Sequence, residues 1–312
     1  MLDLPVEIYR RMIPALQVAS ALMEQARPHL VKIYRAPVIY PPGVTGDESI
    51  NDPANPAPHY LDDRFKPKLA DYAAFDDMIQ DLIPVFRIFQ LDRYNARMVG
   101  GSGSQVFGLT NSERFTASMP DGSTAHMVVS RSGIARDFFN ELARGDWYQL
   151  PETQRQRVLV TLGITLLHEF VHVIWLERHQ VRFLHDLEIY GTIYGPNEPL
   201  MDGGQRYQEL GTAVESLILG GMIQFSTGAP DHPRYPNDGV FDGSEELHYS
   251  YITPEGWPSG IFILTSASVA AFFDSRTWET DRWGKIPPIQ LWLIRSHDTR
   301  LANFIERRVL RR

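Results

Sequence analysis

Residues 158–176 read VLVTLGITLLHEFVHVIWL and contain the motif His168-Glu169-Phe170-Val171-His172. The apolar run is longer than a typical strand and leaves almost no polar face, so we predict a helix that is surrounded by protein. An α-helix turns once in about 3.6 residues, so residues four apart in the sequence lie on one face. Both imidazoles can therefore reach one metal ion, while Glu169 lies one step further round the helix.

Two histidines and a glutamate are unfavourable inside a protein unless something pairs with them. A buried ion pair or a hydrogen-bonded core histidine would explain one of the three side chains, but not all three at this spacing. The spacing is that of zinc sites in which two histidines bind the metal and the glutamate acts as general base. We therefore expect His168 and His172 to be metal ligands, Glu169 to be the catalytic base and Zn²⁺ to be the cofactor.

Composition excludes several classes of protein. The 312 residues are 43% hydrophobic and 22% charged, as in ordinary globular proteins, and the net charge of −8 argues against nucleic-acid binding. The chain has no cysteine, so disulfides and thiolate ligands are excluded and any metal ligand must be a histidine or a carboxylate. The first residues do not resemble a secretory signal, and the one long apolar run carries the charged motif. We expect a cytoplasmic protein that does not span a membrane.

Periodicity and turn residues predict an α+β fold. A small mixed or antiparallel sheet should pack on the buried motif helix, with a largely helical remainder. We expect one domain over residues 1–312, with subdomains 1–150 (N-terminal helices and sheet) and 151–312 (metal helix and a helical C-terminal part). One or two helices are predicted over 6–36, and single helices over 68–89, 134–144, 151–178 and 205–223. A β-hairpin is predicted from strands 114–119 and 124–130, and irregular segments from 37–67 and 229–256.

A zinc ion held by two histidines needs a third protein ligand. The metzincin pattern requires glycine and histidine at the positions of Trp175 and Arg178, so it is excluded. The remaining option is a downstream carboxylate, Glu209 or Glu215. These are six residues apart, about 240° round a helix, so we expect only one of them to bind the metal.

The segment Gly211-Thr212-Ala213-Val214-Glu215 resembles the GTxxD element of the aspzincin peptidases, with glutamate in place of aspartate. Gly211 would allow close approach to the motif helix. Glu209 resembles the helix-borne ligand of the gluzincins, although it lies 37 residues beyond His172 (209 − 172). We favour Glu215 as the ligand, with Glu209 as the alternative or as a hydrogen-bond partner of a ligand imidazole.

Over residues 151–223 the chain thus resembles the zincin metallopeptidases, of gluzincin or aspzincin type. The resemblance implies a zincin-like fold and a zinc-dependent hydrolase that cleaves a peptide or amide bond with metal-activated water and Glu169 as general base. It also implies that strand 124–130 is the edge strand that pairs with an extended substrate. The alternatives are a zincin-like hydrolase or cyclase acting on a small non-peptide amide or ester, and a non-catalytic, metal-stabilised binding protein. Candidates for a donor to the oxyanion are His185, Tyr190, Tyr194, Tyr207, His248, Tyr249 and Tyr251.

Overall fold

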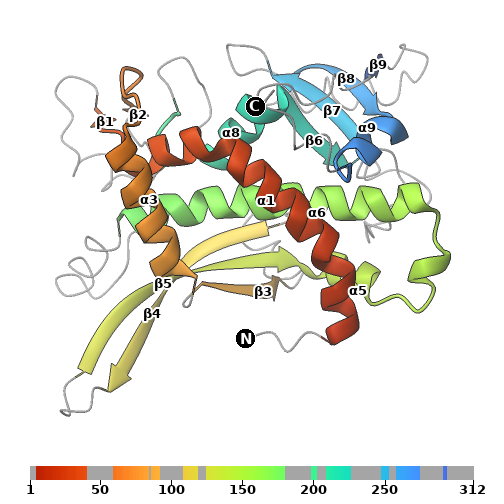
Figure 1. Ribbon diagram of the computed structural model, residues 1–312, viewed down its shortest axis with the longest axis horizontal. Coiled ribbons are helices and arrows are strands. Elements are labelled where there is room, and N and C mark those ends of the chain that lie inside the picture. The colour runs from red at the N-terminus through yellow and green to blue at the C-terminus, as the bar shows by residue number, and fades with distance from the viewer. Residues whose placement is uncertain are drawn as a thin grey trace, which may run out of the picture.

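The computed structural model describes residues 5–40, 59–83, 86–91, 108–118, 124–179, 198–201, 209–225, 247–252, 258–274 and 291–293. These residues form an α+β structure of helices and small sheets (Figure 1). Its elements are α1 (Val6–Arg35), β1 (Val38–Ile39), β2 (Tyr60–Leu61), α3 (Leu69–Leu82), β3 (Arg87–Leu91), β4 (Gly108–Ser118), β5 (Thr124–Ala135), α5 (Arg136–Leu142), the 3₁₀ turn η1 (Trp147–Gln149), α6 (Glu152–Arg178), α8 (Leu210–Leu219), β6 (Gly221–Phe225), β7 (Leu247–Ile252), β8 (Pro258–Leu264), α9 (Ser266–Ala271) and β9 (Leu291–Leu293).

The motif helix α6 lies between the sheet formed by β3, β4 and β5 and the part of the chain that contains α8 and β6–β9 (Figure 1). Pro151 precedes it in an extended conformation, and the carboxylate of Glu152 lies in its first turn, near the positive end of the helix dipole. Every residue from 158 to 167 is buried, which confirms the predicted buried helix. By length and composition α6 could cross a membrane, but 83% of its most apolar window is buried within this structure, as in a core helix.

Helix α1 crosses α6 and covers it with small side chains (Figure 1). Ala15, Val18 and Ala19 are buried there, and a methyl group added to Gly163 of α6 would lie 2.8 Å from Cγ1 of Val18. The helix axes can approach this closely because Gly163 has no side chain. The predicted helix 6–36 is confirmed as one element that contains two prolines.

The sheet beside α6 has the strand order β3-β5-β4. Strands β4 and β5 form the predicted antiparallel hairpin, from Gly108↔Ile134 to Ser118↔Thr124, and β3 runs parallel to residues 131–135 of β5. The sheet is therefore mixed. Strand β5 is central only over residues 131–135, where it pairs with both β3 and β4. Over residues 124–130 it pairs with β4 alone among the described strands, which agrees with the prediction of an edge strand. The outermost positions belong to β3 and β4.

Two predicted helices are shorter than expected. The helix predicted over 68–89 ends at Leu82, and Arg87 begins strand β3, because Pro84 lacks the amide hydrogen that a continuing helix needs. The helix predicted over 205–223 is α8, and it ends at Gly220, which has a φ of 73°. Glycine reaches this left-handed conformation without steric cost and commonly ends helices.

Among the described residues after Gly220, the chain is mostly strand and not helical as predicted. Strands β6, β7, β8 and β9 form a four-stranded antiparallel sheet in that order, and the short α9 follows β8. The segments are short and apolar, and at that length periodicity does not distinguish a strand from a buried helical turn. Within the predicted irregular segment 37–67, β1 pairs with β2 through Val38↔Leu61; residues 41–58 lie outside the described residues.

Candidate metal centre

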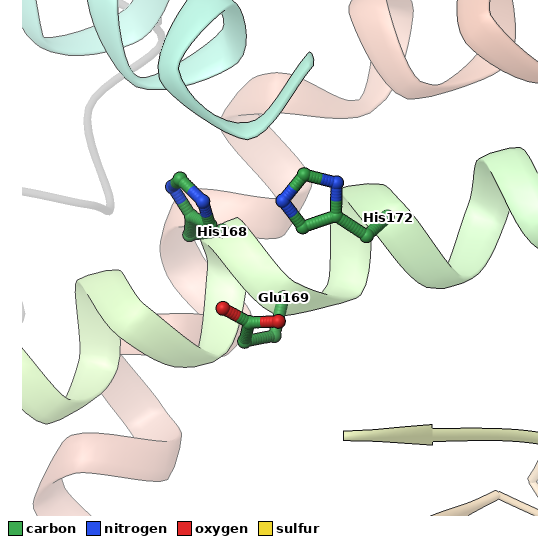
Figure 2. Close-up of side chains that lie close together, drawn as sticks. All are labelled: His168, Glu169 and His172. Carbon is green, nitrogen blue, oxygen red and sulfur yellow. The ribbon is translucent and has the colours of Figure 1, made fainter. Parts of the chain in front are cut away.

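The two motif histidines lie side by side on one face of α6 and point toward α8 (Figure 2). Their ring centroids are 4.9 Å apart. Glu169 leaves the helix in a different direction (Figure 2). The four-residue spacing therefore has the predicted consequence, with two imidazoles on one face and the glutamate beside it.

A third side chain meets the two imidazoles at Oε1 of Glu209. This oxygen is 3.2 Å from Nε2 of His168 and 2.9 Å from Nε2 of His172. Neither contact has hydrogen-bond geometry, and Oε1 is buried without a hydrogen-bond partner. The other oxygen, Oε2, accepts a hydrogen bond of 2.5 Å from the amide of Thr212 and so caps the start of α8. The cap holds the carboxylate with Oε1 facing both rings.

This arrangement fits a metal ion. A buried anionic oxygen without a hydrogen bond is unfavourable, and a cation placed between it and the two ring nitrogens would remove that penalty. Ligand atoms of His168, Glu169 and His172 lie within 4.8 Å of one another, and so do those of His172, Glu198 and Glu209. Two imidazoles and one carboxylate form a donor set that catalytic zinc accepts. The residues present could therefore hold a metal ion.

Each imidazole is fixed from behind by a second carboxylate. Nδ1 of His168 donates to Oε1 of Glu215 over 2.7 Å, and Nδ1 of His172 donates to Oε1 of Glu198. A carboxylate can only accept, so each ring carries its hydrogen on Nδ1 and leaves Nε2 available to a metal.

Oε1 of Glu209 faces Nε2 of both histidines, whereas Glu215 contacts Nδ1 of His168, so these contacts reverse the order of preference drawn from the sequence. As expected, the two carboxylates do not meet the same side of the site. The reversal arises because Glu209 is the cap that precedes α8, whereas Glu215 lies within the helix. The carboxylate of Glu215 is buried behind the ring of His168 and accepts its hydrogen bond. Glu215 therefore has the role of hydrogen-bond partner that is the alternative role predicted for Glu209.

Glu198 was not predicted. It lies between Pro196 and Pro199 in a stretch that the sequence indicates as a loop, and no helical spacing relates it to the motif. A glutamate shortly before the helix that carries the other carboxylates is the only sequence signal for its role.

Gly211 allows the close approach that the sequence predicts. A methyl group at this position would lie 2.7 Å from Cε1 and Nε2 of His168. No real methyl group packs so tightly against a ring, so glycine is required for α8 to lie directly on the imidazole.

Glu169 is held by the sheet. Its side chain is 4% exposed, and Oε2 accepts a hydrogen bond of 2.7 Å from Oγ1 of Thr110 on β4. Thr110 is in turn 2.7 Å from Oγ of Ser132 on β5. A methyl group at Gly108 would lie 2.2 Å from Oε1 of Glu169, so the first residue of β4 packs directly on the carboxylate.

Burial and neighbouring charges shift the pKa values of the site. Burial lowers the pKa of both imidazoles, but the carboxylates outweigh it: Glu209 and Glu215 hold the pKa of His168 well above its usual value, and Glu198 and Glu209 raise that of His172 to about 10. Burial raises the pKa of Glu209, but the two imidazoles outweigh it and hold that pKa well below its usual value. Burial raises the pKa of Glu169, and the imidazoles and Thr110 only partly offset this.

Comparison of the chain with protein-family models, curated proteins and solved structures gave no match. The site is therefore interpreted from its own geometry. Among the oxyanion candidates, His185, Tyr190, Tyr194 and Tyr207 lie outside the described residues. His248, Tyr249 and Tyr251 belong to β7, and only their backbone is described.

Proposed function

We propose that this chain is a zinc-dependent hydrolase of zincin type that cleaves a peptide or amide bond, with His168, His172 and Glu209 as the metal ligands. The observation that carries the proposal is the buried Oε1 of Glu209, which approaches Nε2 of both motif histidines without a hydrogen bond. A protein without a metal here would have to leave this charge unpaired or protonate both rings.

Bound zinc would supply Lewis-acid chemistry, since it polarises a carbonyl group and makes water more acidic. Glu169 would take the proton from the attacking water and deliver it to the leaving nitrogen. Thr110 anchors Oε2 of Glu169 and so keeps the carboxylate from rotating away. Burial raises the Glu169 pKa toward neutrality, which suits a group that must both accept and release a proton. A purely structural metal site has no use for such a base.

The position of β4 favours an extended peptide as substrate. This strand is outermost in the described sheet, and its first residue packs on the carboxylate of Glu169. An extended peptide that adds to the outer side of a strand gains main-chain hydrogen bonds. A peptide bound along β4 would thus run beside the base.

Metal analysis of the purified protein tests the ligand set. We expect about one zinc per chain in the wild type and none in His168→Ala or Glu209→Ala. Glu215→Ala is the matched control. It removes a carboxylate from the same site but no ligand, so zinc should remain while affinity falls about 10–100-fold. Zinc that stays in Glu209→Ala and is lost in Glu215→Ala would show that the ligand assignment is wrong.

Incubation with a mixture of unrelated peptides, followed by mass spectrometry of the products, tests the reaction. Glu169→Gln should keep its zinc and lose cleavage by a factor of at least about 100, the contribution of a positioned general base. Cleavage by Glu169→Gln at the wild-type rate would exclude the assigned role of Glu169.

A further inference from the structure

We propose that Glu198 is a positioning residue that sets the distance between two metal ligands on separate elements, His172 of α6 and Glu209 at the start of α8. The inference rests on the proposed metal site and concerns how that site is assembled.

The two oxygens of Glu198 have different partners. Oε1 accepts from Nδ1 of His172, and Oε2 accepts a hydrogen bond of 2.7 Å from the amide of Leu210. Leu210 follows Glu209 directly and is the first residue of α8. One carboxylate therefore connects the back of one ligand ring to the backbone next to another ligand.

The backbone beside Glu198 is itself fixed to a distant part of the chain. The amide of Leu200 donates to the carbonyl of His59 over 2.8 Å, and the amide of Leu61 donates to the carbonyl of Leu200 over 3.0 Å. Residue 200 is thus a short parallel extension of β2, which pairs with β1 just after α1. Glu198 consequently holds the site from a support that belongs to neither α6 nor α8.

Glu215 provides a comparison within the same site. It also accepts from the Nδ1 of a ligand histidine, but it does so from within α8 and needs only one acceptor oxygen for that bond. A glutamine at 215 can keep the bond by turning its amide oxygen toward His168. A glutamine at 198 has one acceptor for two donors, so its NH₂ group must face either the imidazole N–H or the Leu210 amide.

The experiment compares Glu198→Gln with Glu215→Gln in zinc affinity, measured by competition with a chromogenic chelator. Both variants lose one charge and change no volume. We expect Glu198→Gln to bind zinc at least about tenfold more weakly than Glu215→Gln. The d–d absorption of the Co²⁺-loaded protein should also change in Glu198→Gln and stay near wild type in Glu215→Gln, because only the first variant displaces a ligand.

Leu210→Pro isolates the connection to α8. Proline removes the amide hydrogen that Glu198 accepts, and the first helical position tolerates it well. In this background the amide oxygen of Glu198→Gln has only His172 as a donor. The loss of zinc affinity from Leu210→Pro to the double variant Leu210→Pro/Glu198→Gln should therefore be no larger than the loss caused by Glu215→Gln in the wild type. Any packing loss from the buried Leu210 side chain is present in both arms and cancels.

Equal affinities and equal Co²⁺ spectra for the two glutamine variants would overturn the positioning role of Glu198 while leaving the metal site intact. An undiminished effect of Glu198→Gln in the Leu210→Pro background would overturn the connection between the two ligands. A wild-type protein that binds neither Zn²⁺ nor Co²⁺ would instead refute the proposed metal site on which the inference rests.

Discussion

Gly211→Ala tests whether α8 must lie directly against His168. The added methyl group would be 2.7 Å from Cε1 and Nε2 of the ring, whereas ordinary van der Waals contact begins at 3.4 Å. The ring or the helix would have to move by about 0.7 Å, the difference between those two distances. Metal–ligand distances tolerate only about 0.2 Å of error, so the displaced Nε2 could no longer bind the metal in its original geometry.

The expected magnitudes separate metal binding from stability. Zinc affinity should fall at least about tenfold, as for other changes that misplace a ligand histidine. The zinc-free protein should lose no more than about 2 kcal/mol of unfolding free energy, because overpacking costs about 1–3 kcal/mol and alanine is about 1 kcal/mol better than glycine in a helix. Chelator competition measures the affinity, and guanidinium unfolding in the presence of a chelator measures the stability.

Gly163→Ala is the matched control. Its methyl group would lie 2.8 Å from Cγ1 of Val18 and 3.0 Å from the carbonyl oxygen of Ala15, at the crossing of α1 and α6. It should destabilise the protein by a similar amount, up to about 2 kcal/mol, and leave zinc affinity unchanged. Wild-type zinc affinity in Gly211→Ala would refute the reasoning, and so would an equal loss of affinity in both variants.

Three further predictions concern the proposed base, a half-buried histidine and the end of α8. Thr110→Val should retain zinc but shift the acidic limb of the pH–activity profile to higher pH. The hydrogen bond from Thr110 lowers the pKa of Glu169, so its removal raises that pKa. Thr110→Ser can keep the hydrogen bond and should leave the acidic limb in place. Burial and then Lys32 lower the pKa of His29 from 6.5, so its contribution to stability is complete above pH 6.5 and is lost as the pH falls through the lowered value. Denaturant unfolding should therefore show that the free energy of unfolding falls less between pH 8 and pH 5 in His29→Gln than in wild type. An identical fall in the two proteins would contradict this. Gly220→Ala should lower the unfolding free energy by about 1–2 kcal/mol in thermal or denaturant melts, and Gly220→Asn by less, because φ at this residue is 73°.

The features that the sequence predicted correctly depend on local patterns. Helices α1 and α6 follow from long apolar periodicities, and the hairpin of β4 and β5 from two strand-like runs around a turn sequence. The two imidazoles share a face because both lie on one helix, four residues apart. Gly211 was identified as a point of close approach because glycine within an apolar helix usually has a packing reason.

The features that the sequence did not predict depend on where separate elements meet. The choice between Glu209 and Glu215 depends on the residue at which α8 begins, because Glu209 precedes the helix as its cap and Glu215 lies within it. Glu198 enters the site only because residue 200 pairs with β2, a strand far away in the chain. Strands β3, β6 and β9 pair with strands that are distant in the sequence, which short apolar runs do not reveal.

The excess of carboxylates over ligands has a physical explanation. Each imidazole contacts two carboxylates. Its Nδ1 donates to one of them, Glu215 or Glu198, and its Nε2 faces Oε1 of Glu209. In the zinc-free protein the rings can balance these charges only by carrying a second proton, and their pKa values are raised accordingly. A zinc ion would replace the protons on Nε2 but not those on Nδ1, since Glu198 and Glu215 continue to accept the latter. At the proposed metal site, protons and metal would compete for the same two nitrogen lone pairs, so we expect zinc affinity to rise with pH until both Nε2 protons are lost.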